Sequence, residues 1–507
     1  MKFVFSMLLV SVVFNSGCSS IAYRPTLQQK QITINDQTDS ISSKQAPSIN
    51  GFPKFIPQKV NHFQLKNGLT VLHFQSHQEF TATTLLGLFL HNPDPYNPIN
   101  LKLNANWNLI KITENEHRLT SLAANIGTNI QRVSDSIATG WYFEVLQKDQ
   151  QKALKLLSYI LNNRVYSGNE LTHQKQNYSL EQQLRNVNGL SLSQQLYKNL
   201  VFSKQSAVSK LSRASSRKKI LEKITVNELQ KYFNQNFNAN KMVLIILSAT
   251  PLEQIKTTIE KSFKQFPILS AEKLNETAIV QSSAAKTPSQ LSLVRPQNSI
   301  YAISRPQSTQ VDIRISFTPL VLQNNEYHSM KLIADVLAGR SLNSRMQSDL
   351  RERQGLSYSI SHQLNQISDF HSLHFLASTE NHKLPALFYG MQQHINYLLE
   401  NGISQNEFNF IKQRRLVNLQ RRRLHPYLKM SFMLQNFTNE NPLDKISYEA
   451  QELSRLTFHE FQAFVKRLQK QPQISIFTGD KSSIKHHLCK LKQCRIQWFN
   501  KQLSPQK

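Results

Sequence analysis

Leu350–Ile360 reads LRERQGLSYSI and places Arg351 seven residues before Tyr358, with a Gly-Leu pair between them. A helical pattern of apolar residues over His328–Leu337 precedes this stretch, and an alternating apolar run follows it. The pattern predicts a helix, a turn and then a strand. Such an arrangement can hold a guanidinium and a phenol toward one place. The alternative is a surface arginine beside a half-buried strand tyrosine.

An internal repeat indicates the domain organisation. Ser167–Gln176 recurs as Ser404–Gln413, and Leu221–Tyr232 recurs as Leu453–Phe464, at offsets of 237 (404 − 167) and 232 (453 − 221) residues. Two matches in the same order at nearly the same offset predict duplicated halves, each of about 200 residues, a normal domain size. The alternative is two unrelated α+β domains.

The second repeat also predicts local structure. Each copy begins with a capping box, in which a threonine and a glutamate three residues later bond the first turn of a helix. The two pairs are Thr225 with Glu228, and Thr457 with Glu460. A short apolar strand and another helix start follow each of these helices.

The first half opens on a predicted hairpin, Phe63–His73, whose Asn67-Gly68 pair is typical of a tight turn. Further strands and helices follow it. The strands are predicted at Thr81–Leu90 and Asp135–Leu146, and the helices near Asn100–Ile110, at Arg118–Ile126 and at Gln151–Leu161.

The N-terminus has the pattern of an export signal. One lysine precedes the apolar run Phe3–Phe14, which is too short to span a bilayer as a stable anchor, and small residues lead to Cys18. The Ser16–Cys18 ending resembles a bacterial lipoprotein cleavage site, which makes Cys18 the lipidated first residue. Ser19 resembles the residue found after the cysteine in lipoproteins of the outer membrane. The alternative is ordinary secretion.

Length and composition divide the chain into parts. A chain of 507 residues predicts two or more domains. We predict a signal peptide at 1–18, a polar tether at 19–56, a first half at 57–269, a linker rich in Ser, Ala, Gln and Pro at 270–308, and a second half at 309–500.

The remaining cysteines and the net charge indicate which bonds and which partners to expect. Cys489 and Cys494 form one even pair in an oxidising compartment, which predicts a disulfide, and two free thiols are the alternative. The formal net charge is +28, with basic clusters at Lys412–Arg415 and Arg421–Arg423 on a polar helical pattern without interleaved aromatic residues. We therefore predict a solvated or membrane-facing surface rather than a nucleic-acid site. Anionic lipid and acidic peptides are the candidate partners of this surface.

Several of these features together resemble the pitrilysin/insulinase family of zinc peptidases. They are two duplicated halves, a first hairpin of the L-x-N-G-L-x-V type, and an R-x-x-x-G-L-x-Y motif formed by Arg351, Gly355, Leu356 and Tyr358. The resemblance covers about Val60 to Asp480. It implies an α+β fold of two halves, each a mostly antiparallel sheet packed by helices, of the LuxS/metallohydrolase-like kind. It also implies that Arg351 and Tyr358 hold an extended peptide across from a zinc site in the first half.

The family's zinc site is an H-x-x-E-H helix, in which two histidines bind the ion and the glutamate activates water, completed by a glutamate on a later helix. This sequence contains no H-x-x-E-H. Glu181 is the candidate for the later glutamate, and the register that it sets puts Leu103, Asn106 and Trp107 in place of the motif residues. Leucine is no ligand, asparagine is no proton acceptor at neutral pH, and the indole nitrogen only donates.

A second register uses Glu116 and His117, with Thr113 in place of the first histidine. One histidine with glutamates is a poor zinc set. We therefore predict a charged, solvated helix start here, no catalytic residues and no cofactor. Glu116, His117 and Glu181 remain weak metal candidates.

Three hypotheses follow. The first is an inactive pitrilysin/insulinase-like lipoprotein on the periplasmic side of the outer membrane, which binds extended peptides through Arg351 and Tyr358 and pairs with a zinc-bearing homologue. The second is an active zinc metalloendopeptidase with an unorthodox ligand set. The third is a structural envelope-interaction protein that uses its basic surface.

Overall fold

The computed structural model describes residues 59–76, 82–90, 111–112, 116–134, 139–162, 188–203, 222–264, 299–323, 325–340, 343–367, 369–423, 425–438, 445–489 and 495–506, with short pieces of 164–180 and 293–296. The predicted signal peptide, Cys18 and the tether lie outside the described residues. Every described element belongs to one compact unit, Phe52–Lys507.

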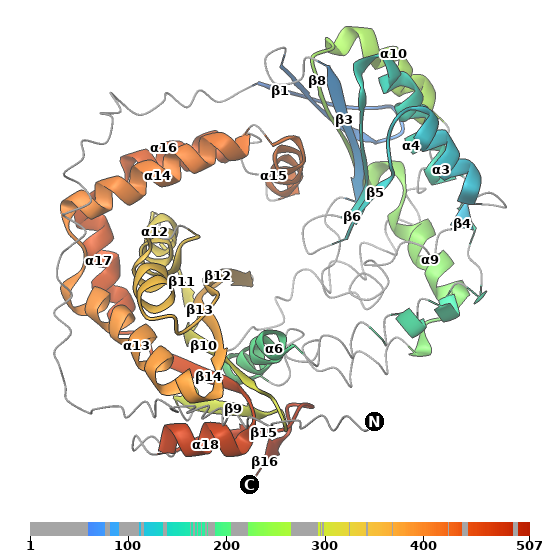
Figure 1. Ribbon diagram of the computed structural model, residues 1–507. Helices are drawn as coiled ribbons and strands as arrows, with labels where there is room; N and C mark the ends of the chain where they lie inside the picture. The colour runs from blue at the N-terminus through green and yellow to red at the C-terminus, as the bar shows by residue number, and fades with distance from the viewer. Residues whose placement is uncertain are drawn as a thin grey trace, which may run out of the picture. The chain divides into compact units, whose positions relative to one another are not determined.

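The first sheet has six strands in the order β1-β2-β8-β3-β6-β5 (Figure 1). All neighbouring strands are antiparallel except β2 and β8, which are parallel. The strands are β1 (Val60–Gln64), β2 (Thr70–Gln75), β3 (Thr83–Leu90), β5 (Gln131–Ser134), β6 (Thr139–Leu146) and β8 (Met242–Ser248).

Helices α4 (Gln150–Asn162) and α10 (Leu252–Phe263) bury their apolar stripes in one cluster with one face of this sheet. Leu154 and Leu157 of α4 share that cluster with Ile255 of α10, because residues three or four apart lie on one side of a helix. Three further elements belong to this half: helix α3 (Glu116–Asn125), helix α9 (Val226–Asn236), and a small sheet of β4 (Lys111–Ile112) with β7 (Arg164–Val165).

The predicted first hairpin is confirmed by β1 and β2. Gly68 turns the chain with a φ of +89°, a left-handed conformation that favours glycine. The Asn67 side chain donates to the Phe263 carbonyl at 2.7 Å, so the turn is tied to the end of α10. The asparagine thus stabilises both the turn and the packing of a helix 196 residues away.

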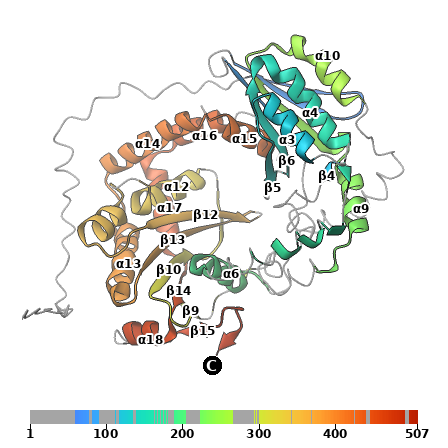
Figure 2. The same cartoon turned by 45° about the vertical axis from the view of Figure 1, so that its right-hand side comes forward.

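The second sheet has the strand order β11-β13-β10-β14-β9-β15-β16, and β12 pairs with β13 at its free edge (Figure 2). The strands are β9 (Ile300–Ser304), β10 (Gln310–Phe317), β11 (Leu320–Val321), β12 (Ile360–Ile367), β13 (Phe370–Glu380), β14 (Gln473–Gly479), β15 (Gln497–Phe499) and β16 (Pro505–Gln506). One large hydrophobic cluster joins this sheet to its helices. These are α12 (Glu326–Ala338), α13 (Leu384–Asn401), α14 (Gln405–Arg423), α16 (Lys445–Arg455), α17 (Phe458–Gln469) and α18 (Lys481–Cys489).

The two sheets confirm the predicted duplication and the α+β class. Strands β2-β8-β3-β6-β5 of the first sheet correspond in order to β9-β14-β10-β13-β12 of the second, and the parallel pair falls at the same place in each. Both predicted capping boxes form, because Glu228 N donates to Thr225 Oγ1 and Glu460 N donates to Thr457 Oγ1, each at 3.2 Å.

The duplication also includes, in each half, one helix that packs on the sheet of the other half. Helix α6 (Gly189–Val201) and helix α15 (Pro426–Thr438) begin 237 residues apart (426 − 189), the offset of the first sequence repeat. Leu192 and Leu196 of α6 pack in one cluster with strands of the second sheet. Met430 and Leu434 of α15 pack in one cluster with strands of the first sheet.

Two sequence predictions need correction. Strand β9 lies inside the range predicted as linker, so the second sheet begins before residue 309. The strand is short and parallel to its neighbours, and Tyr301, Ala302 and Ile303 are all buried. Its sequence therefore shows no alternation of apolar and polar residues. The basic cluster Lys412–Arg415 is not simply solvated. Lys412 is buried and donates to the carbonyls of Ser454 and Leu456. The helical stretch predicted near Asn100–Ile110 lies outside the described residues. The other boundaries stay predictions.

Over the described ranges, no helix combines the length and the apolar character needed to cross a membrane.

Candidate functional site

The helix, turn and strand predicted around Leu350–Ile360 are present. Helix α12 leads to a π-helical turn, η4 (Gln347–Arg353), and β12 begins two residues after Tyr358. Single π-type turns occur frequently at functional sites. Leu350 anchors η4 in the core, where a Cβ added to Gly390 would lie 2.4 Å from a Leu350 methyl carbon. Glycine at position 390 therefore lets α13 approach the turn closely.

The loop between η4 and β12 is held by hydrogen bonds to β13. Gly355 has a φ of +61°, which favours glycine, and its N–H donates to the Arg351 carbonyl at 3.1 Å. Thr379 Oγ1 donates to the Leu356 carbonyl at 2.6 Å, and Ser357 Oγ donates to the Ser378 carbonyl at 2.7 Å. These bonds fix the loop directly before the exposed residue that follows it.

That residue is Tyr358, whose relative exposure of 88% is far above that of a packed aromatic side chain. The Arg351 guanidinium lies 5.2 Å from the centre of the Tyr358 ring, within the range of a cation–π contact. Arg351 also pairs with Glu352 at 3.2 Å. The structure therefore brings together the two residues that the sequence singled out, with the phenol directed to solvent.

A hydrogen-bonded pair below the turn, formed by the buried His394 and the partly buried Asp349, was not found from the sequence. His394 of α13 lies 2.8 Å from Asp349 of η4 through Nε2 and Oδ2, and Arg353 and Gln354 donate to the other carboxylate oxygen. Burial opposes ionisation of Asp349, but the bonds from His394, Gln354 and Arg353 outweigh it and hold its pKa well below the usual range. Asp349 is thus a charged pin that fixes η4, and Arg351 with it. The only sequence signal was the spacing of four between Asp349 and Arg353.

The metal candidates remain untested by geometry. Helix α3 begins at Glu116 and contains His117, but their side chains are not among those described, and Glu181 and Leu103–Trp107 lie outside the described residues. Elsewhere in the described ranges, no three His, Cys, Asp or Glu side chains gather into a possible ligand set. The chemistry of the residues at the predicted motif positions can still be compared with that of zinc ligands, and a leucine, an asparagine and a tryptophan do not fit a zinc ion.

The cysteine predictions also stay predictions. Cys489 is the last residue of α18, its side chain is not among those described, and Cys494 and Cys18 lie outside the described residues.

Comparison with protein families gives a match to the model described as "Peptidase M16 inactive domain" over residues 223–415. The matched range includes Arg351 and Tyr358 and ends within α14. The resemblance to the M16, or pitrilysin/insulinase, peptidase family is therefore confirmed over these residues. Comparison with curated protein sequences gives no match.

Solved structures of two proteases and of a peptidase M16 inactive domain share this fold. A protease from Helicobacter pylori has a TM-score of 0.67 at 12% identity, covering 84% of this chain and 100% of its own. A peptidase M16 inactive domain from Pseudomonas fluorescens has a TM-score of 0.65 at 15% identity, covering 83% of this chain and 98% of its own. The periplasmic protease PqqL from Escherichia coli has a TM-score of 0.63 at 13% identity, covering 86% of this chain and 47% of its own. Together with the family match, these findings support an inactive M16 peptidase homologue.

Proposed function

We propose that this M16 family member is a non-catalytic peptide-binding protein of the cell envelope, which pairs with a zinc-bearing homologue. The observation that carries the proposal is the Arg351–Tyr358 pair. Tyr358 leaves most of its apolar ring in solvent beside the Arg351 guanidinium, which is unfavourable for an aromatic side chain without a binding partner. The turn that presents the ring is fixed by Asp349 and by two hydrogen bonds to β13. Exposed tyrosine and arginine are the residue types that most often dominate binding energy.

The chemistry of the pair suits an extended peptide. The guanidinium offers five N–H donors and the phenol one hydroxyl, all able to bond backbone carbonyls, while the ring offers an apolar face. The ion pair of Arg351 with Glu352 is partly exposed on both sides, at 33% and 47%, and a pair of that kind contributes little. The guanidinium can therefore exchange this partner for a peptide at small cost.

The side chains at the positions of the family's zinc motif argue against catalysis by this chain alone. Leu103, Asn106 and Trp107 stand where the family's zinc motif would be, so hydrolysis of a bound peptide would depend on a homologue with an intact motif. The location follows from the export signal and from the cysteine at position 18. PqqL is described as periplasmic, and we propose the same compartment here, with Cys18 lipidated and held at the outer membrane.

We expect Arg351→Ala and Tyr358→Ala each to weaken the binding of an unfolded fluorescent peptide by about tenfold or more, the size of a binding hot spot. Both side chains are exposed enough for the melting temperature to stay nearly unchanged. Arg421→Ala and Tyr448→Ala are matched controls on α14 and α16, and we expect them to bind normally. Equal losses in the control variants, or full binding by both site variants, would refute the assignment of the pair.

We also expect the purified protein with added zinc to show no chelator-sensitive cleavage of unfolded peptides. The reason is that one histidine and glutamates make a poor zinc set. Metal content measured on the same sample separates the hypotheses. Stoichiometric zinc with cleavage that Glu181→Ala abolishes would establish the active-peptidase alternative instead.

A further inference from the structure

A long stretch of basic residues without a carboxylate side chain lies at the C-terminal end of the chain. Residues 481–507 contain seven lysines and arginines and no aspartate or glutamate. In the fold, α18 packs beside β9 and β14, and β15 with β16 extends the same sheet next to β9 (Figure 1). The described basic residues of this stretch therefore belong to one end of the second sheet rather than to a separate tail.

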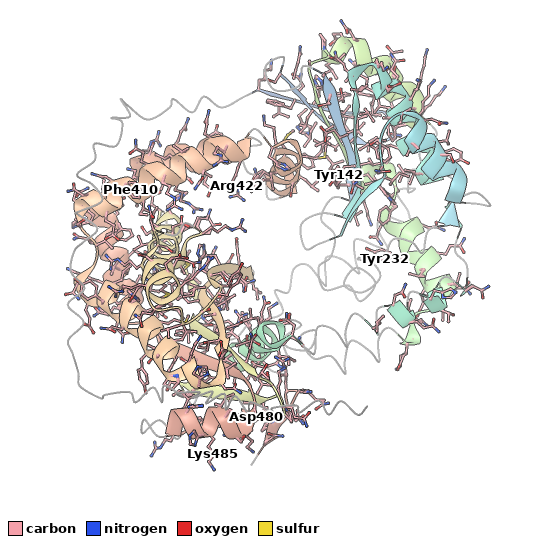
Figure 3. The ribbon with its side chains drawn as sticks, viewed as in Figure 1. Tyr142, Tyr232, Phe410, Arg422, Asp480 and Lys485 are labelled. Atoms are coloured by element: carbon pink, nitrogen blue, oxygen red, sulfur yellow. The ribbon has the colours of Figure 1, made fainter. Side chains whose placement is uncertain are left out.

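Side-chain and packing contacts join the parts of this surface. Lys481 Nζ at the start of α18 lies 5.4 Å from the centre of the Trp498 ring on β15. Helix α18 also contacts the short turn η5 (Asn381–Lys383), which adds another lysine. We call this area the C-terminal basic surface, and it consists of Lys383, Lys481, Lys485, Arg495 and Lys501. Figure 3 shows Lys485 on the outer side of α18, and Arg495 and Lys501 are exposed as well.

The carboxylates beside this surface already have partners. Asp480 accepts bonds from Ser482 Oγ, from Ser483 N at 3.0 Å and from Gln307 N at 3.3 Å, and these bonds lower its pKa. Glu380 pairs with Lys383 at 3.3 Å and with His382 at 3.5 Å. Two carboxylates facing this many cations leave the surface positive.

We propose that the C-terminal basic surface docks on a phospholipid layer that contains anionic headgroups. Lysine and arginine near such a layer each strengthen its attraction for a protein, and tryptophan prefers the level of the headgroups. Trp498 is only half-buried, and it lies beside Lys481, so both groups belong to the same face.

A lipid anchor at Cys18 would hold this surface near a membrane, and this step rests on the envelope location proposed above. For the polar tether predicted from the sequence at 19–56, a root-mean-square reach of about 5–6 Å times the square root of its length gives an average distance of about 30–40 Å between the lipid anchor and the body. Nucleic acid is the rival ligand for a basic surface. It is disfavoured here because proteins that bind single-stranded nucleic acid use aromatic side chains that can stack on bases. The Trp498 ring is partly buried, and the Lys481 ammonium lies over it.

The test uses the chain from Phe52 onward, the compact unit that contains every described element and lacks the signal and the anchor. Its co-sedimentation is measured with phosphatidylcholine vesicles with and without phosphatidylglycerol, at low and high salt. We expect binding to the phosphatidylglycerol vesicles alone, weakened by salt. Lys485→Glu with Lys501→Glu should lower that binding by about tenfold or more.

The matched control reverses two exposed lysines at the end of α10, Lys261→Glu with Lys264→Glu, and makes the same change in net charge. We expect it to bind vesicles normally, and both variants to bind peptide normally, so a failure here is distinct from a failure of the peptide site. Circular dichroism checks the fold, and Lys485→Gln with Lys501→Gln replaces the reversal variant if that one unfolds. Equal losses in the α10 control, or tighter binding of a duplex DNA fragment through Lys485 and Lys501, would overturn the proposal.

Discussion

Replacing Lys331 with methionine should lower the free energy of unfolding by about 3–5 kcal/mol, the cost of breaking one side of a buried ion pair. Lys331 of α12 and Glu449 of α16 are hydrogen-bonded to each other at relative exposures of 7% and 6%. Burial alone would raise the pKa of Glu449, but the charge and hydrogen bond of Lys331 outweigh burial and keep it lowered. Methionine fills the volume of lysine but removes the cation that is hydrogen-bonded to this buried carboxyl group. Urea denaturation measures the loss.

The double variant Lys331→Met with Glu449→Leu should recover most of that stability, because a buried pair exchanged for apolar residues of similar volume is often neutral or stabilising. The exposed pair of Lys383 with Glu380 gives the comparison, since Lys383→Met breaks a pair whose side chains are 34% and 55% exposed. A surface pair of that kind contributes about 1 kcal/mol or less. A cost this small at Lys331 as well would mean that the pair is solvated, contrary to its burial.

The fold was largely predictable because its signals are local. The Asn67-Gly68 turn, the two capping boxes and the repeated order of helix, strand and helix all lie within short stretches of sequence. Strand β9 was missed for a physical reason: it is short and central, and its burial on both faces erases the alternation that reveals a strand. The exchange of α6 and α15 between the halves was also beyond reach. A helix's apolar stripe shows that it packs, but not which sheet it packs on.

The candidate site was predictable in part. The spacing of Arg351 and Tyr358 across a glycine turn was enough to place them together, because the turn is closed by local bonds. The pin below them was not predictable, since Asp349 and His394 are 45 residues apart and meet only through the packing of α13 on η4. The same holds for Lys412, which looks like part of a solvated charge run but satisfies the carbonyls at the end of α16.

Mild acid should destabilise the protein well above the pH at which carboxylates titrate, because several histidines are buried in neutral form. His374 of β13 is wholly buried, and burial first, then the charges of Arg314 and Lys198, lower its pKa well below the ordinary value. Burial also lowers the pKa of His73, against a bond to the Thr250 carbonyl. Below about pH 6.5 the unfolded chain takes up protons that the folded chain refuses, so stability falls as the pH falls.

For His374 alone this loss approaches about 1.4 kcal/mol per pH unit below pH 6.5, and it should appear in urea denaturation between pH 7.5 and 5.5. His374→Gln should be less stable at pH 7.5, since the ring accepts or donates bonds to Ser316 at 2.7 Å and Ser372 at 2.9 Å, but its stability should depend less on pH. His486→Gln, at an exposed position on α18, should keep the pH dependence of the unchanged protein. A His374→Gln variant as sensitive to acid as the unchanged protein would mean that His374 is protonated in the folded state despite its burial.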